Sequence, residues 1–562
     1  MKPKNKKLVK FFFSYQKKYL SIAAITASLL LMNVLLRLPM PLVTRYLIDH
    51  ILPEKDFKAL NTLCIALLLV IIFRLLSDYF MQYFIAKYKA RVHFDLEKDL
   101  YLHLQELPLF YFTKRPSGYI LSRISEISSV ESVMADTFLF ILRDILTILV
   151  GAVLILSLHL PLGLISLGLL PFFIYSIKIF HKKIKAVNTE LREENALYYG
   201  KLEKNIDAVE KIKSAVKEET EGKRISRRLS RVIGLDLKST LISALASTVS
   251  AAIGAIAPFI VLWYGLSSIM KGDLTLGTFF AINSFLGYLY NPARNLTQTG
   301  YSISRAMAGL ERIYEIFMEK QEPDGGDPID AIESIEFRDV GFSYNDNGND
   351  WVLKGLNLKI NRGERVALVG ESGEGKSTLV KMILKFYYPT MGELYISGKN
   401  SKDISIKGLR KKTAYISQRQ HILEDDLEEK KDDTKVRKLL KKFKFEKSME
   451  ETGGSLQQKE FSGGEVQKLE IVETLLKEAD VLIIDEGTSN IDFKGEKIVL
   501  GELFEKYKDK IIIFIAHRLT SITDFERILV LNRGRIVEDG THGKLMKNKG
   551  RYFSLWGSRE SK

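Results

Sequence analysis

Long apolar runs without any Asp, Glu, Lys or Arg fill much of the first 300 residues of this 562-residue chain. These uncharged runs occupy residues 20–36, 59–73, 145–177, 241–270 and 274–293. A helix needs about 20 apolar residues to cross a bilayer, and helical cores of soluble proteins rarely contain uncharged runs of that length. The run at 145–177 is too long for one span, and a His-Leu-Pro-Leu-Gly break at 159–163 divides it. We therefore predict six membrane-spanning helices.

The distribution of basic residues predicts how these helices are oriented. Lysines and arginines gather before the first span, between the second and third, and after the fourth. Because positively charged loops stay on the cytoplasmic side, we expect these loops and both chain ends in the cytoplasm. The Lys-rich N-terminus is not followed by a convincing cleavage site, so we interpret it as leading into an uncleaved first span.

Charge and cysteine content argue against two other classes of protein. The formal net charge is +15, but the basic residues flank apolar runs or are scattered over the C-terminal part. Because no basic groove laced with aromatic residues is recognisable, we expect no nucleic-acid partner, and a membrane-anchored protein acting on DNA is disfavoured. The single cysteine, Cys64, has no second cysteine with which to form an intramolecular disulfide.

Two long segments between the predicted spans, residues 86–135 and 183–238, are charged and almost free of proline and glycine. This composition predicts helices that extend into the cytosol. A change in composition follows at residues 321–327, which read Gln-Glu-Pro-Asp-Gly-Gly-Asp and are typical of a linker. We therefore assign residues 1–320 to a transmembrane domain with six helices and two long cytoplasmic loops, 321–332 to a linker, and 333–562 to a second domain.

In this second domain, an apolar strand at residues 365–369 leads directly into a glycine-rich loop and then a helical pattern. Glycines let backbone N–H groups surround phosphates, the lysine of such a loop reaches the β- and γ-phosphates, and the serine binds Mg²⁺. A glycine-rich turn alone can be a structural loop, but this strand-to-helix context predicts nucleotide binding. The residues of the predicted P-loop are Gly370, Glu371, Ser372, Gly373, Glu374, Gly375, Lys376, Ser377 and Thr378.

A second apolar strand, residues 481–484, ends in Asp485 and Glu486. Asp485 is placed to hold Mg²⁺ through water, and Glu486 to polarise an attacking water. An apolar strand that ends in acids can also simply be leaving the core. Together with the P-loop, however, the two acids predict an ATP hydrolase.

Three further motifs make a family resemblance specific. The order P-loop, Gln418, Ser462-Gly463-Gly464, Asp485-Glu486 and His517 is that of ABC ATPases, and the six spans before it match the exporter branch. Over essentially its whole length, the chain resembles an ABC half-transporter of the exporter type. This resemblance implies an all-α six-helix transmembrane domain joined to an α/β P-loop ABC ATPase domain with a parallel-sheet core.

The resemblance also implies roles for residues that would look ordinary alone. Tyr344 would stack on adenine, His517 would contact the γ-phosphate, and Gln418 would sense Mg²⁺ and the membrane domain. Ser462, Gly463 and Gly464 would close over ATP held by a second chain. Seen in isolation, Tyr344 and His517 would more often be structural, and Gln418 a polar surface residue. Short coupling helices that press on the ATPase domain would lie at residues 110–118 and 205–213.

The implied function is export, driven by ATP hydrolysis with Mg²⁺, of a hydrophobic or amphipathic substrate: a peptide such as a bacteriocin, a drug, or a lipid. The implied location is the cytoplasmic membrane of a prokaryote, among membrane lipids, with the ATPase domain in the cytoplasm. Lys376, Gly463, Gly464, Glu486 and His517 are all present, which favours a homodimer over a heterodimer with one degenerate site. An ATP-gated membrane regulator or sensor is the alternative.

Some positions depart from the usual family pattern. Phe461 and Glu465 flank the signature where Leu and Gln are usual, and Gly487 stands where Ala is typical. The segment between Gln418 and Ser462 is charge-dense and short for an exporter. Residues 1–18 offer no room for a peptidase domain, so export with leader cleavage is not expected.

Overall fold

The computed structural model describes residues 3–115, 117–323, 325–344, 350–418, 434–443, 463–487, 491, 493–516 and 518–560. The chain forms two compact units. The first comprises Met1–Gln105 and Pro116–Glu319, and the second comprises Glu106–Arg115 and Lys320–Lys562. A short piece of the segment between the second and third predicted spans thus belongs to the second unit.

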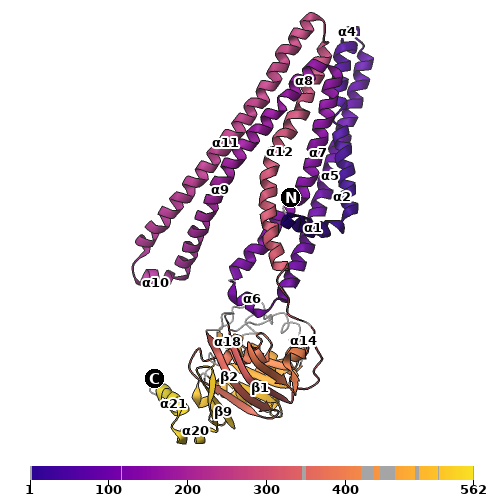
Figure 1. Ribbon diagram of the computed structural model, residues 1–562. Coiled ribbons are helices and arrows are strands. Elements are labelled where there is room, and N and C mark those ends of the chain that lie inside the picture. Colours follow the sequence, from indigo (N-terminus) through magenta and orange to yellow (C-terminus); the bar gives the residue numbers. More distant parts are fainter. Residues whose placement is uncertain are drawn as a thin grey trace. The chain divides into compact units, whose positions relative to one another are not determined.

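The first unit is built from helices (Figure 1). They are α1 (Pro3–Lys17), α2 (Leu20–Leu35), α3 (Pro39–Tyr46), a π-helical turn (Leu47–Ile51), α4 (Leu52–Glu54), α5 (Phe57–Gln105), α7 (Ser117–Leu158), α8 (Leu160–Gly168), α9 (Leu170–Asp207), α10 (Val209–Ser214), α11 (Glu218–Lys271) and α12 (Leu276–Phe317).

Local sequence explains where these helices break. α2 ends before Pro39, which lacks the N–H that a continuing helix would need and instead begins α3. Between α7 and α8, the His159 ring accepts a hydrogen bond from the Leu162 N–H at 3.3 Å and caps α8. α11 ends at Gly272, whose φ of 84° is readily adopted only by glycine. The proline and glycine signals in the sequence therefore coincide with real helix ends.

Four helical stretches among the described residues are long and apolar enough to cross a membrane: 20–54, 57–105, 140–158 and 218–271. Residues 160–172 form a shorter apolar helix. The fourth predicted span corresponds to this helix and the start of α9, and the sixth to the first part of α12. The helices therefore follow the predicted order.

The segment between the fourth and fifth predicted spans is a long helical hairpin. α9 and α11 run side by side, and α10 lies at the turn between them (Figure 1). Buried Val187 and Leu235 contribute to the hairpin interior, and Ser239 Oγ donates to Asn188 Oδ1 at 2.8 Å. Nearer the turn, Lys201 forms an ion pair with Glu221 at 2.8 Å. The hairpin is thus stabilised along its length by both apolar and polar contacts.

The second unit contains two sheets. The smaller has strand order β2-β1-β4-β5, and the larger β10-β9-β3-β8-β7-β6. In the larger sheet β9, β3, β8, β7 and β6 are parallel, and only β10 is antiparallel to its neighbour. The strands are β1 (Ser334–Ser343), β2 (Trp351–Asn361), β3 (Arg365–Val369), β4 (Met391–Ile396), β5 (Lys399–Asn400), β6 (Thr413–Ile416), β7 (Val481–Asp485), β8 (Ile511–Ile515), β9 (Arg527–Asn532) and β10 (Arg535–Gly540).

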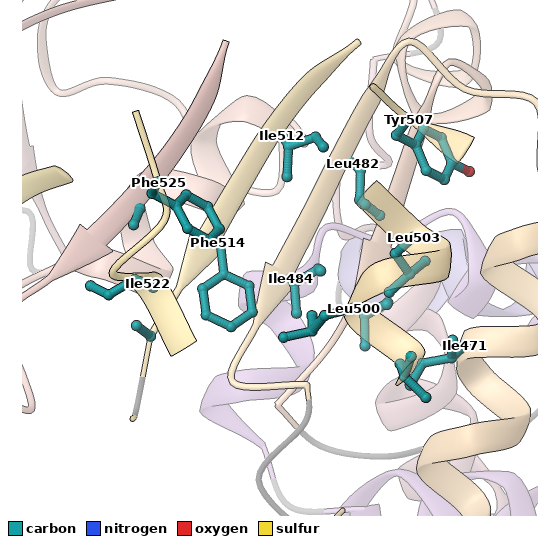
Figure 2. Close-up of a cluster of buried hydrophobic side chains, with 14 of the residues drawn as sticks. Ile471, Leu482, Ile484, Leu500, Leu503, Tyr507, Ile512, Phe514, Ile522 and Phe525 are labelled. Carbon is teal, nitrogen blue, oxygen red and sulfur yellow. The ribbon is translucent and has the colours of Figure 1, made fainter. Parts of the chain in front are cut away.

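Helices accompany these strands. They are α6 (Leu109–Lys114), α13 (Lys376–Ile383), α14 (Ile406–Lys411), α16 (Thr434–Lys442), α18 (Gly463–Leu476), α19 (Phe493–Lys506), α20 (His542–Asn548) and α21 (Arg551–Glu560). Alternate residues of the larger sheet's strands face two separate apolar clusters. Figure 2 shows one cluster, in which Leu482 and Ile484 of the sheet lie near Leu503 and Leu500 of α19. Val481 and Ile483 belong to the other cluster, so the parallel strands are buried on both faces.

Candidate functional site

The predicted site residues lie where neighbouring parallel strands end. β3 leads into the P-loop, β7 ends at Asp485, and β6 ends two residues before Gln418. Because β3, β8, β7 and β6 are adjacent and parallel, their carboxyl ends meet at one edge of the sheet. Ligands of open α/β sheets bind at this edge. His517 follows β8 but, like Ser462, it lies outside the described residues.

The P-loop wraps around the N-terminus of α13. Gly373 and Gly375 have φ values of 88° and 100°, a region in which side chains are strained, so these two glycines are needed for the turn. Lys376 is the first residue of α13, and its Nζ donates to the carbonyl oxygens of Gly370 at 3.1 Å and Glu371 at 2.7 Å. The loop therefore presents backbone N–H groups, a helix N-terminus and a buried cation together, a combination suited to phosphates.

Ser377 and Asp485 meet across the site. Ser377 Oγ donates to Asp485 Oδ1 at 3.0 Å, and Tyr415 Oη lies 3.4 Å from the other carboxylate oxygen. Asp485 is almost fully buried, and burial raises the pKa of its carboxyl above the usual value although these hydrogen bonds oppose the rise. One carboxylate and one hydroxyl fit Mg²⁺, which typically takes one or two protein oxygens and completes its shell with water and phosphate. The described residues contain no cluster of three or more His, Cys, Asp or Glu side chains suited to a metal.

Glu486 and Gln418 are directly connected. Gln418 Nε2 donates to Glu486 Oε2 at 2.8 Å. Glu486 has a φ of 55°, which is uncommon for a residue with a side chain. Gly487 follows, and a Cβ added there would lie 2.3 Å from Ile416 Cγ2. The family's usual alanine at this position would therefore clash with Ile416, which explains this departure in the sequence.

Tyr344 lies beside the P-loop helix. Its Oη and Thr378 Oγ1 are 2.8 Å apart, and its ring packs edge-on against Phe342 and Tyr387 with centroid distances of 4.9 and 5.3 Å. The side chain is 37% exposed, so part of the ring is available to a ligand. Gly463 and Gly464 form the N-terminal end of α18, directly after undescribed residues of the signature.

Sequence reasoning missed a buried carboxylate that positions Gln418. Glu470 of α18 accepts hydrogen bonds from the Ser417 N–H at 3.0 Å and the Ser417 hydroxyl at 3.3 Å. Burial raises the pKa of Glu470, and the bonds from Ser417 oppose that rise. Nothing in the local sequence marks this glutamate, because its contact depends on α18 packing against the end of β6.

The segment between the second and third predicted spans contributes α6 to the second unit. Phe110 packs against the apolar cluster that includes Leu379 and Tyr387. Near the linker, the Glu322 N–H donates to the Glu106 carbonyl at 2.8 Å, and Arg410 forms two hydrogen bonds with the Glu322 carboxylate at 2.6 and 2.9 Å. These contacts connect the predicted coupling segment and the linker to the two-sheet fold of the second unit.

Comparisons with known proteins agree with this geometry. The family described as "ABC transporter transmembrane region" matches residues 24–293, and the family "ABC transporter" matches residues 353–489. Both regions are present in one chain, in the order that the sequence predicted.

Individual relatives cover most of the chain. An ATP-dependent lipid A-core flippase from Syntrophus aciditrophicus is 30% identical over 90% of this chain and 87% of its own length. The lactococcin-G-processing and transport ATP-binding protein LagD from Lactococcus lactis is 30% identical over 91% of this chain and 74% of its own length. A solved bacterial Atm1-family ABC exporter with ATP bound has a TM-score of 0.82 at 20% identity, covering 96% of this chain and 98% of that chain, and so shares the fold.

Proposed function

The chain belongs to the ABC transporter family, as a half-transporter of the exporter type, and we propose that it exports an amphipathic peptide or drug across a bacterial cytoplasmic membrane. The general activity follows from the family: transmembrane export of a hydrophobic substrate coupled to ATP hydrolysis. The observation that carries the proposal is that one chain contains both apolar spanning helices and a sheet edge at which the P-loop, Asp485, Glu486 and Gln418 converge.

Within this family assignment, we assign individual roles to the residues of the site. The P-loop and Lys376 bind the phosphates of ATP, and Tyr344 stacks on the adenine. Ser377, Asp485 and Gln418 hold Mg²⁺, which would neutralise charge on the phosphates. Glu486 orients and polarises the attacking water, and His517 contacts the γ-phosphate. The 2.8 Å contact between Gln418 and Glu486 supports a shared role, because it places the amide beside the carboxylate that accepts the proton.

A half-transporter of this family works as a dimer, and we propose a homodimer. The residues whose loss marks a degenerate site are all present in this chain: Lys376, Gly463, Gly464, Glu486 and His517. Symmetric pairing is also the commonest arrangement of oligomers. In this arrangement Ser462, Gly463 and Gly464 of each chain close over ATP on the partner's P-loop.

Relatives of this chain are named for different substrates. The relatives include a flippase for lipid A-core and a transport protein for lactococcin G. We favour a peptide or drug over a lipid because no feature of the sequence is specific to a lipid substrate. All three classes share an amphipathic character, which suits a binding surface among membrane helices.

Reconstitution in proteoliposomes tests this function. Inside-out vesicles containing the chain should accumulate a fluorescent amphipathic peptide or dye only with MgATP, and vesicles containing Lys376→Ala should not. ATP-dependent accumulation of a labelled lipid but of no peptide or drug would overturn the substrate class. ATP hydrolysis without accumulation of any compound in the panel would instead favour the ATP-gated regulator.

A further inference from the structure

The P-loop carries two carboxylates close to where it would hold the highly charged phosphates. Each carboxylate is held by a segment near the C-terminus of the chain. The Glu371 carboxylate forms an ion pair with the Arg551 guanidinium, and the Glu374 carboxylate accepts a hydrogen bond from the Arg533 N–H. Arg551 lies 180 residues after Glu371, so only the fold brings the two together.

Arg551 is held in place by its own surroundings. It is the first residue of α21, and the Glu538 carboxylate of β10 accepts the N–H groups of Arg551 at 2.7 Å and Tyr552 at 2.9 Å. A Cβ at Gly550 would lie 1.8 Å from Glu538 Oε1, so the carboxylate reaches the helix only because residue 550 is glycine. Tyr552 is fully buried and anchors the helix. These contacts fix the Arg551 backbone. From this position the Arg551 side chain reaches the Glu371 carboxylate of the P-loop.

The same side of the P-loop is closely packed against other backbone segments. A Cβ at Gly370 would lie 2.7 Å from the Leu531 carbonyl oxygen, and one at Gly534 would lie 2.5 Å from the Val352 carbonyl oxygen. The turn between β9 and β10 thus contacts both β2 and the loop. Together with α21 it forms a C-terminal support, defined here as residues 531–534 and 550–552.

The charge of Arg551 in this support affects how strongly the P-loop would bind a nucleotide. A carboxylate near the phosphates of ATP repels them, and an adjacent guanidinium cancels much of that repulsion. The Glu371 and Arg551 side chains are 58% and 36% exposed, so solvent screens the interaction. The expected effect on affinity is therefore modest, about two- to fivefold, as for an exposed ion pair.

We propose that Arg551 is a positioning residue for nucleotide binding, which neutralises Glu371 and thereby sets the affinity of the P-loop for ATP. This inference rests on the proposed nucleotide-binding role of the P-loop. It assigns to the C-terminal helix a part in the ATP site, although that helix contains none of the family's motifs.

The test is a double-mutant cycle on the full-length chain in nanodiscs. The variants are Arg551→Ala, Glu371→Gln and the combination, and the measurements are the dissociation constant of a non-hydrolysable ATP analogue, KM for ATP and kcat. Arg551→Ala should raise the dissociation constant and KM about two- to fivefold and leave kcat unchanged. In the Glu371→Gln background, Arg551→Ala should raise the dissociation constant by at most half as much. Arg551→Lys keeps the positive charge and should therefore retain most of the affinity of the unsubstituted protein.

Lys547→Ala is the matched control, because it removes the same charge from an exposed position on α20. The inference is overturned if Arg551→Ala changes affinity no more than Lys547→Ala does. It is also overturned if Arg551→Ala weakens binding equally with and without the Glu371 charge, since α21 would then act only as structural support. Unchanged affinity in Lys376→Ala would instead remove the P-loop assignment on which the inference rests.

Discussion

The Gln418 side-chain amide donates a hydrogen bond of 2.8 Å to the Glu486 carboxylate. The first residue follows β6 and the second follows β7, so the contact depends on the parallel pairing of these two strands. Glu470 fixes the backbone just before Gln418 through Ser417. If the segment that contains Gln418 moved, its hydrogen bond to the candidate catalytic carboxylate of Glu486 would change directly.

Glu486→Gln should abolish most hydrolysis and leave ATP binding intact. The amide keeps the shape of the side chain and an oxygen that can accept from Gln418, but it cannot take a proton from water. Loss of such assistance typically slows a reaction by about 10²- to 10⁴-fold. Steady-state ATPase rates and nucleotide binding measure the two effects separately. Exposed Glu478→Gln is the control, and near-normal turnover in Glu486→Gln would remove the assigned role.

Gly487→Ala should destabilise the ATPase unit because its methyl group would overlap Ile416 Cγ2. Overpacking of this kind costs about 1–3 kcal/mol, seen as a lower temperature of the calorimetric unfolding transition. Ile416→Leu removes the Cγ2 branch and should restore part of the loss. Gly501→Ala, on α19 with no atom within 4 Å of the added methyl, should not destabilise the unit and should stabilise it by about 0.5–1 kcal/mol, because alanine favours a helix over glycine. Equal stability of Gly487→Ala and Gly501→Ala would contradict the packing explanation.

The orientation of the spans predicts which single cysteines react from outside the cell. In a Cys64→Ala background, a cysteine at Lys55 should react with an impermeant maleimide, and one at Lys182 should react only after permeabilisation. Both side chains are exposed in the structure, so burial would not explain a failure to react. External labelling at 182 but not at 55 would reverse the topology.

Expressed alone, the chain should form a dimer that holds two nucleotides. Glu486→Gln should trap ATP. The ratio of trapped nucleotide to protein, combined with the mass of the complex in nanodiscs, gives the number of competent sites per dimer. A value of two per dimer is expected because nothing in the motifs marks this chain as the degenerate partner. A stable monomer without ATPase activity that is rescued by a second half-transporter would contradict the homodimer.

The membrane spans and the P-loop were predictable because their signals are local. Uncharged runs, the proline and glycine breaks, and the strand-to-helix context of the P-loop are all properties of neighbouring residues, and they coincide with the observed helices and with β3 and α13. The apolar strand at 481–484 was likewise recognisable, since a strand buried on both faces reads as a continuous apolar run.

The order of the parallel strands decided which of these residues meet. Gln418 and Glu486 are 68 residues apart, Ser377 and Asp485 are 108, and Glu371 and Arg551 are 180. Parallel strands are joined by crossovers of varying length, so distance along the chain does not tell which strand ends become neighbours. The sequence alone thus determined the family and the spans, and it predicted which residues are the candidate reactive groups. The tertiary structure alone paired Gly487 with Ile416, Ser417 with Glu470, and the C-terminal helix with the P-loop, because packing contacts form between surfaces that only the folded sheet brings together.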